Sequence, residues 1–408
     1  MVSGRATAEL VVGSGLAAAM TIGYIVYASR TIGAAESSDF FAALSVIYIV
    51  GVALSPLTPT IARLTTRCRA AAGPGAVAAL RSVALGRVLI FTGAVTFVGA
   101  CASLLLAHTF HFRSAVPLIL AFAAVLVYAI VSVDRGVLQG LFLLRTYNAN
   151  VIAEAAVRLV VAAALLLFMR AASAALLAYV AGLAVSELLI IAPLVRTWRG
   201  AARERVQWKD VERLAVPMFV LMCALAAFQN TDMLAVKRWL PPHDAGAYGA
   251  AMTLARGIGV IFVPFYVVAG PMLTALHDSG KSVLRPAIRL TGWFLAAAIV
   301  PLAVLAAVSP LLVATLYGPD FLSAAAIAAP LAGVTAITYA GVMLAQALVT
   351  LHDFRFLIGY GIFAVVQVAG LALFHATFRD VLYVLYASQG AALLSVCASF
   401  LLAWKVRR

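Results

Sequence analysis

Long apolar runs separated by short polar joints make up most of the chain. Crossing a hydrocarbon core of about 30 Å takes roughly 20 residues at 1.5 Å per residue. Because no water reaches that depth to bond exposed backbone groups, we expect each run to be an α-helix. The twelve predicted spans are residues 9–29, 39–61, 84–106, 115–141, 148–169, 173–195, 214–236, 245–276, 287–308, 322–349, 355–375 and 381–404. The pattern therefore predicts an all-α integral membrane protein with about 12 transmembrane helices.

Composition and charge agree with this fold class and add an orientation. Hydrophobic residues make up 65% of the chain and charged residues 11%, against about 25% charged residues in soluble domains. With a cytoplasmic N-terminus, 21 lysines and arginines fall on the inner side and six on the outer side, namely Arg30, Arg113, Arg170, Lys237, Arg238 and Arg379. This positive-inside asymmetry predicts a multi-pass protein of the cytoplasmic (inner) membrane with both termini in the cytoplasm. The net charge of +14 then reflects contact with anionic membrane lipids, and we expect no nucleic-acid partner.

The chain divides near its middle at its longest polar joint. We predict an N-terminal lobe at residues 1–198 (spans one to six), a cytoplasmic linker at 199–213 and a C-terminal lobe at 214–408 (spans seven to twelve). At a constant offset of 208, residues 25–48 align with 233–256, so that Glu36 meets Asp244 and Phe40 meets Tyr248. Both halves start with the same orientation. This predicts two pseudo-symmetric six-helix lobes around a central cavity, a typical transporter architecture.

Motifs of catalysis and nucleotide binding are missing from the sequence. It contains no HExxH, GxSxG or GxxxxGK[ST] pattern. The outer joints are too short to house a soluble domain, and the inner joint at 62–83, with a Gly-Pro-Gly turn between basic clusters, is predicted to be flexible. We therefore expect no enzyme activity, no metal site and no cofactor.

Ionisable residues inside the predicted spans are the main functional candidates, since each costs about 2.5–3.5 kcal/mol if it faces lipid. Five of them lie in spans four to six: Asp134, Arg135, Glu154, Arg158 and Glu187. Glu154 and Arg158 share one helix face at i,i+4 spacing. We expect the five to form one partly neutralised cluster. Either Arg135 and Arg158 contact substrate while the acids serve coupling, or all five form an ion-pair network that holds three helices together.

The C-terminal half offers a second group of candidates. Arg256 lies near the middle of span eight with no acidic residue a turn away on its own helix, and Gln229 and Asp232 share a face of span seven. Because a guanidinium binds phosphate oxygens in pairs, Arg256 is the strongest candidate for contact with an anionic head group. The alternative is an Asp232–Arg256 salt bridge without ligand. We expect a hinge at Gly257-Ile258-Gly259. Three glutamines have two possible roles, lining a sugar path or only bonding neighbouring helices: Gln346, Gln367 and Gln389.

Three short segments resemble a known family. Residues 28–33 (ASRTIG) followed by residues 40–43 (FFAA) look like the first hairpin of the oligosaccharide flippases. Residues 135–140 (RGVLQG) resemble the inner end of span four in that family, and residues 229–232 (QNTD) followed by 245–248 (AGAY) resemble its seventh-span hairpin. Together they resemble the Wzx-type polysaccharide transporters of the multidrug/oligosaccharidyl-lipid/polysaccharide (MOP) superfamily.

The resemblance implies a transport function. It implies that the protein flips an undecaprenyl-diphosphate-linked oligosaccharide between leaflets by alternating access, coupled to an ion gradient. Arg256 would contact the head group, and a polysaccharide polymerase and glycosyltransferases would be partners. Two alternatives remain. A MATE-like cation-coupled drug or metabolite exporter would depend on carboxylates rather than on Arg256, and a non-transporting scaffold of polysaccharide assembly would tolerate the loss of cavity charges. The related lipid II flippases carry arginines within their first two spans, which this chain lacks.

Overall fold

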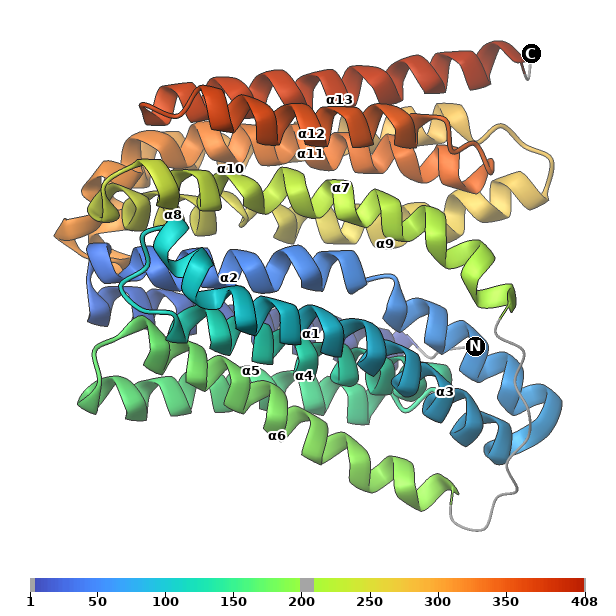
Figure 1. Ribbon diagram of the computed structural model, residues 1–408. Helices are drawn as coiled ribbons and strands as arrows, with labels where there is room; N and C mark the ends of the chain where they lie inside the picture. Colours follow the sequence, from blue (N-terminus) through green and yellow to red (C-terminus); the bar gives the residue numbers. More distant parts are fainter. Residues whose placement is uncertain (1–3, 199–208, 407–408) are drawn as a thin grey trace. The chain divides into compact units, whose positions relative to one another are not determined.

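The computed structural model describes residues 4–198 and 209–406. Over these ranges the chain forms thirteen α-helices and one short 3-10 helix (Figure 1): α1 (Gly4–Ile32), α2 (Ala34–Leu54), α3 (Leu57–Thr109), α4 (Val116–Gly140), α5 (Leu144–Phe168), α6 (Ala172–Trp198), α7 (Lys209–Trp239), α8 (Pro242–Ala255), α9 (Ile258–Asp278), α10 (Leu284–Leu316), η1 (Pro319–Ala324), α11 (Ala325–Thr350), α12 (Phe356–Leu373) and α13 (Phe378–Val406). Eleven helical segments of the described residues are long and apolar enough to cross a membrane. The predicted all-α membrane fold is confirmed.

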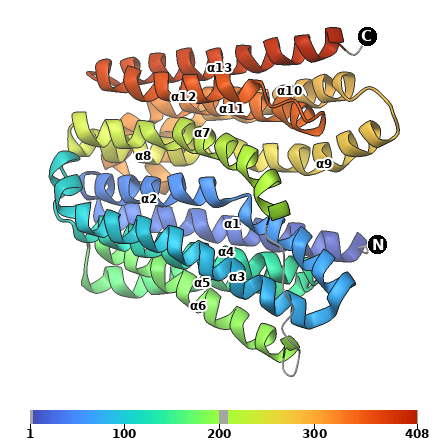
Figure 2. The same cartoon turned by 45° about the vertical axis from the view of Figure 1, so that its right-hand side comes forward.

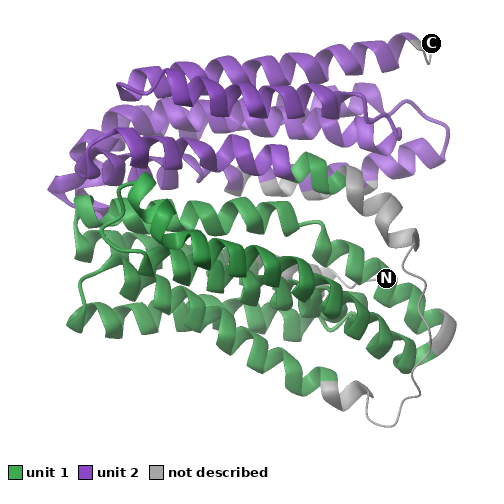
Figure 3. Cartoon of the chain, viewed as in Figure 1, with its two compact units in different colours: residues 1–222 green, residues 223–408 purple. Residues whose placement is uncertain are grey.

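Two compact units make up the chain, Met1–Met222 and Cys223–Arg408 (Figure 3), and α7 runs across the division between them. Residues 199–208 of the predicted linker lie outside the described residues, as do three arginines of the inner-side count in that stretch, Arg199, Arg203 and Arg205.

Unit 1 packs around α4, which contacts α2, α3, α5 and α6. Between α3, α4 and α6 lies a fully buried aliphatic core: Ile61, Val77, Ala84, Val131, Val133, Val137, Leu138, Ile190 and Leu194. Two glycines one turn apart on α4 allow its backbone to approach α3. A Cβ on Gly136 would lie 2.7 Å from the Thr58 backbone oxygen, and one on Gly140 would lie 2.5 Å from the Ala62 backbone oxygen. Such small residues bring helix backbones close together in a bilayer, where burial of apolar surface does not drive association.

The joint predicted to be flexible at residues 62–83 is helical, so that prediction is wrong. Helix α3 runs through it, and only Gly73 leaves helical geometry, with φ 75° and ψ −163°. Alanines precede this point and favour helix. Glycine tolerates the positive φ, and Pro74 suits the first turn of the helix that follows. The break separates two candidate spans, Ala34–Ala70 and Gly73–Thr109.

In unit 2, α11 contacts α8, α9, α10 and α13, and α12 lies beside α13 in both views of the chain (Figures 1 and 2). The predicted eighth span, 245–276, is two helices rather than one. Helix α8 ends at Ala255 and α9 begins at Ile258. Across the break, the N–H of Gly257 bonds the Leu254 oxygen at 3.0 Å and the N–H of Gly259 bonds the Arg256 oxygen at 2.8 Å. These bonds span three residues instead of four, so the backbone tightens at the predicted hinge.

The helix ends follow the internal offset found in the sequence. Helix α2 begins at Ala34 and α8 begins at Pro242, which is 34 + 208 = 242. Phe40 and Tyr248, which the offset aligns, are both fully buried. The two halves then diverge, because α2 continues to Leu54 whereas α8 stops beside Arg256.

Candidate functional site

The Glu154 carboxylate, 12% exposed, joins two arginines in unit 1. The Nη2 of Arg135 on α4 donates to Oε2 of Glu154 on α5 at 2.6 Å, and Nη2 of Arg158 donates to the other oxygen, Oε1. The Arg135 guanidinium also donates from Nε to Asn150 Oδ1 at 2.9 Å and from Nη2 to Ser186 Oγ on α6 at 3.2 Å. The i,i+4 pair expected on α5 is present, and the network links three helices.

Aromatic rings enclose Arg158, whose side chain is 5% exposed. Its guanidinium carbon lies 3.8 Å from the ring centroid of Tyr179 on α6 and 5.7 Å from that of Tyr24 on α1. A cation over an aromatic face is stabilised by the ring quadrupole. Gly182 lets α6 approach, since a Cβ there would lie 2.9 Å from the Glu154 backbone oxygen. These contacts favour the ion-pair interpretation of Arg158 over a substrate contact.

Asp134 and Glu187 belong to a second, neighbouring network around Arg81 of α3. The Arg81 Nε and Nη2 donate to the two oxygens of Asp134 at 2.6 and 2.5 Å. Glu187 Oε1 lies 3.8 Å from Arg81 Nη2. Its Oε2 is buried and has no hydrogen-bond partner among the described residues. The five residues expected in one cluster thus form two networks. Sequence reasoning missed Arg81 because it lay in the joint predicted to be a loop.

In unit 2, Arg256 lies at the break between α8 and α9 and reaches α7. Its Nη2 donates to the Gln229 backbone oxygen at 2.9 Å and to Asn230 Oδ1 at 2.6 Å. Asp232 Oδ2 accepts a 2.6 Å hydrogen bond from the Tyr248 hydroxyl of α8. Tyr248 was not predicted as a partner, although a signal existed. It aligns with Phe40, and a tyrosine that replaces phenylalanine at a buried position requires an acceptor for its hydroxyl.

A small cavity brings the unit 2 candidates together. Gln229, Asp232 and Arg256 all line it, together with Gln389 and with three polar residues that the sequence analysis did not single out: Thr335, Thr338 and Tyr339. Its volume of 30 Å³ accommodates ordered water but no diphosphate in this conformation.

The buried glutamines bond neighbouring helices, which was one of the two roles expected for them. Gln367 Nε2 on α12 donates to the α7 oxygens of Ala227 and Phe228 at 3.2 Å each. Its Oε1 accepts from Ser388 Oγ at 3.1 Å and from Gln389 Nε2 at 3.0 Å. Gln389 Nε2 also reaches the Phe228 oxygen at 3.0 Å. The three helices α7, α12 and α13 therefore share one polar seam.

Comparisons with known proteins agree with this architecture. A family model described as "Polysaccharide biosynthesis protein" matches residues 3–277. No curated protein matches the sequence. An inward-facing MATE multidrug transporter of the MOP superfamily is similar in structure at 15% identity, covering 94% of both chains with a TM-score of 0.68.

Two further solved structures have the same fold. The lipid II flippase MurJ in an inward closed conformation is 12% identical, with a TM-score of 0.68 over 97% of this chain and 87% of that one. A MOP superfamily transporter from Pyrococcus furiosus is 15% identical, with a TM-score of 0.56 over 99% and 94%. At these identities the likeness establishes the fold, and the MOP fold implied by the sequence motifs is confirmed.

Proposed function

Because the chain belongs to the family of polysaccharide biosynthesis proteins, we propose that it is a flippase for an undecaprenyl-diphosphate-linked oligosaccharide. The protein is a multi-pass membrane protein with a MOP transporter fold. In our proposal it moves the lipid-linked repeat from the inner to the outer leaflet of the cytoplasmic membrane by alternating access. Both termini are cytoplasmic in this topology, and a polymerase and glycosyltransferases supply and consume the substrate.

The observation that carries the proposal is the position of Arg256. Its guanidinium lies at a cavity wall, and the partners of Nη2 on α7 are a backbone oxygen and an amide oxygen, both neutral. The same cavity is lined by further polar groups, those of Gln229, Asp232 and Thr338. A diphosphate matches such a site because guanidinium and phosphate form paired, charge-assisted hydrogen bonds.

Entry of the head group requires the cavity to widen, since its present volume is 30 Å³. The break between Ala255 and Ile258 supports this step. Helix interruptions beside a binding site are a recurrent feature of transporters, because they free backbone groups and allow the two halves of a span to move separately. In our proposal α9 moves relative to α8 when the cavity opens.

The acids of unit 1 divide into structural and coupling roles in this proposal. Both oxygens of Glu154 and both of Asp134 bond arginines, so these residues hold the helices together. Glu187 has one buried oxygen without a partner among the described residues, and we assign it the coupling proton or cation. Asp232 has the same feature in unit 2, at Oδ1.

The test replaces Arg256 by alanine and by lysine in cells whose surface polysaccharide depends on this protein. We expect Arg256→Ala to lose surface polysaccharide and to accumulate lipid-linked precursor, and Arg256→Lys to keep part of the activity through its charge. Arg145→Ala, at a residue whose side chain is 81% exposed, is the matched control and should export normally. Membrane abundance and thermal stability confirm that each variant is folded.

The same experiment separates the alternatives. Normal export by folded Arg256→Ala contradicts the head-group role. Altered drug susceptibility in Asp232→Asn, with normal polysaccharide in Arg256→Ala, indicates a MATE-like exporter. Intact function in both variants together with Glu187→Gln indicates a scaffold.

A further inference from the structure

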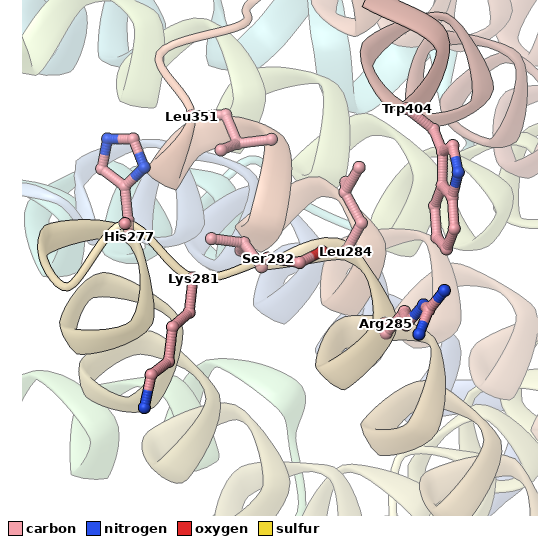
Figure 4. Close-up of a pocket in the computed structure, with 9 residues that line it drawn as sticks. His277, Lys281, Ser282, Leu284, Arg285, Leu351 and Trp404 are labelled. Atoms are coloured by element: carbon pink, nitrogen blue, oxygen red, sulfur yellow. The ribbon is translucent and has the colours of Figure 1, made fainter. Parts of the chain in front are cut away.

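A larger pocket lies at one end of unit 2, and none of the predicted site residues lines it (Figure 4). Its volume is 530 Å³, within the usual range of about 300–1,000 Å³ for ligand sites. Four helices meet there: the end of α9, the start of α10, the end of α11 and the last turns of α13. Its wall includes His277, Lys281, Ser282, Arg285, Leu351 and Trp404.

The pocket is cationic. Lys281 and Arg285 are exposed and His277 is half-buried, and no carboxylate is found among the described residues that line the cavity. Figure 4 places His277 and Lys281 at one end, Arg285 beside Trp404 at the other, and Ser282 and Leu284 between them. Basic side chains therefore lie at both ends of the pocket.

The start of α10 adds to this positive potential. The helix has 33 residues, and its N-cap, Val283, provides no side-chain cap. Leu284 and Arg285, in the first turn, line the pocket. The N–H groups of a first helical turn lack intrahelical acceptors and carry the positive end of the helix dipole, so they favour a negatively charged oxygen.

The apolar residues of the pocket wall indicate which class of molecule the anionic group belongs to. Leu351 is buried at the end of α11, and Trp404 lies near the end of α13. One candidate span begins at Leu284 and another ends at Lys405, so the pocket lies where helices leave the hydrocarbon. Tryptophan concentrates at that level of a bilayer, and basic pockets between helices bind lipid head groups there.

We propose that this pocket binds the phosphate of an anionic phospholipid from the leaflet on its side of the membrane. Arg285 and Lys281 hold the phosphate oxygens, and the backbone N–H groups of Leu284 and Arg285 donate to them, since Pro286 has none. Trp404 and Leu351 contact the glycerol and upper acyl carbons. The site is separate from the cavity at Arg256 and does not depend on the function proposed above.

The test measures binding to the purified full-length protein in neutral detergent by native mass spectrometry. The probes are dihexanoyl phosphatidic acid, dihexanoyl phosphatidylcholine and inorganic phosphate. We expect the phosphatidic acid to bind and the double variant Lys281→Ala/Arg285→Ala to weaken it about tenfold or more, as about 1 kcal/mol per basic residue implies. Arg289→Ala removes one positive charge, one turn beyond Arg285 on α10 and at an exposed residue outside the pocket lining, and should change affinity less than about twofold.

Three outcomes overturn the proposal. If phosphatidylcholine binds as tightly as phosphatidic acid, the pocket does not require an anionic lipid. Inorganic phosphate that binds as tightly as phosphatidic acid removes the lipid as the source of the phosphate. An equal loss in Arg289→Ala and in the double variant shows a general effect of surface charge rather than a site.

Discussion

Glu154→Gln tests whether one carboxylate holds unit 1 together. The substitution keeps the size of the side chain but removes the negative charge that Arg135 and Arg158 share. The Arg158 side chain is buried at 5% exposure and that of Arg135 is 13% exposed, so little water reaches either charge. Removing one partner of a buried ion pair costs about 3–5 kcal/mol. Because two guanidinium groups lose the same anion, we expect a loss of about 3–5 kcal/mol in the free energy of unfolding.

The assay is reversible unfolding in mixed detergent and SDS micelles, followed by far-UV circular dichroism. Glu9→Gln is the matched control, since Glu9 pairs with Arg145 at 3.1 Å and the Arg145 side chain is 81% exposed. An exposed pair contributes about 0–1 kcal/mol. The same chemical change should thus have a much smaller effect at residue 9 than at residue 154.

A double-mutant cycle sharpens the comparison. Arg135→Gln should cost less in the Glu154→Gln background than in the wild type, because the 2.6 Å contact is already lost. The reasoning is refuted if Glu154→Gln costs no more than Glu9→Gln, or if the two changes at residues 135 and 154 are additive.

Two further predictions concern packing and polar contacts. Gly140→Ala should lower the free energy of unfolding by about 1–3 kcal/mol, because the new Cβ would lie 2.5 Å from the Ala62 backbone oxygen. Gly93→Ala is the control, since a Cβ there meets nothing within 4 Å. Equal unfolding midpoints for the two variants would contradict close packing of α3 on α4. Gln367→Leu should cost about 1–3 kcal/mol, because it removes the hydrogen bonds to the α7 oxygens and leaves one Gln389 amide hydrogen without its acceptor. Gln346→Leu, at a half-buried residue, is its control, and a similar loss there would show that the seam contributes nothing specific.

Hydropathy predicts the helices well because each helix that crosses the hydrocarbon core must itself consist mainly of apolar residues. It misses breaks that do not change composition. Residues 245–276 are mainly apolar, with Arg256 as their one charged residue, so the interruption at Gly257 leaves only a glycine pair as a signal. Conversely, the glycine, proline and arginines of 62–83 resemble a loop, yet a single residue, Gly73, absorbs the whole turn.

Site residues were predictable where helix geometry alone brings them together. The Glu154–Arg158 pair follows from i,i+4 spacing on one helix. The Arg81–Asp134 pair spans 53 residues and depends on how α3 packs against α4, which no spacing in the sequence reveals. Likewise, Gln229, Asp232 and Arg256 share a cavity with Thr338 and Gln389 only because α11 packs against α8 and Gln389 of α13 reaches the α7 backbone.

The seam of glutamines has a consequence for any carbohydrate that passes it. The amide hydrogens of Gln367 and Gln389 are already donated, and both amide oxygens already accept. An arriving hydroxyl gains a hydrogen bond to an amide N–H or to Gln367 Oε1 only by displacing an existing one, so that exchange is close to neutral in free energy. Amides whose N–H groups are already donated offer a sugar chain no free donor. Hydrogen bonding to these amides therefore gives little basis for distinguishing one saccharide from another.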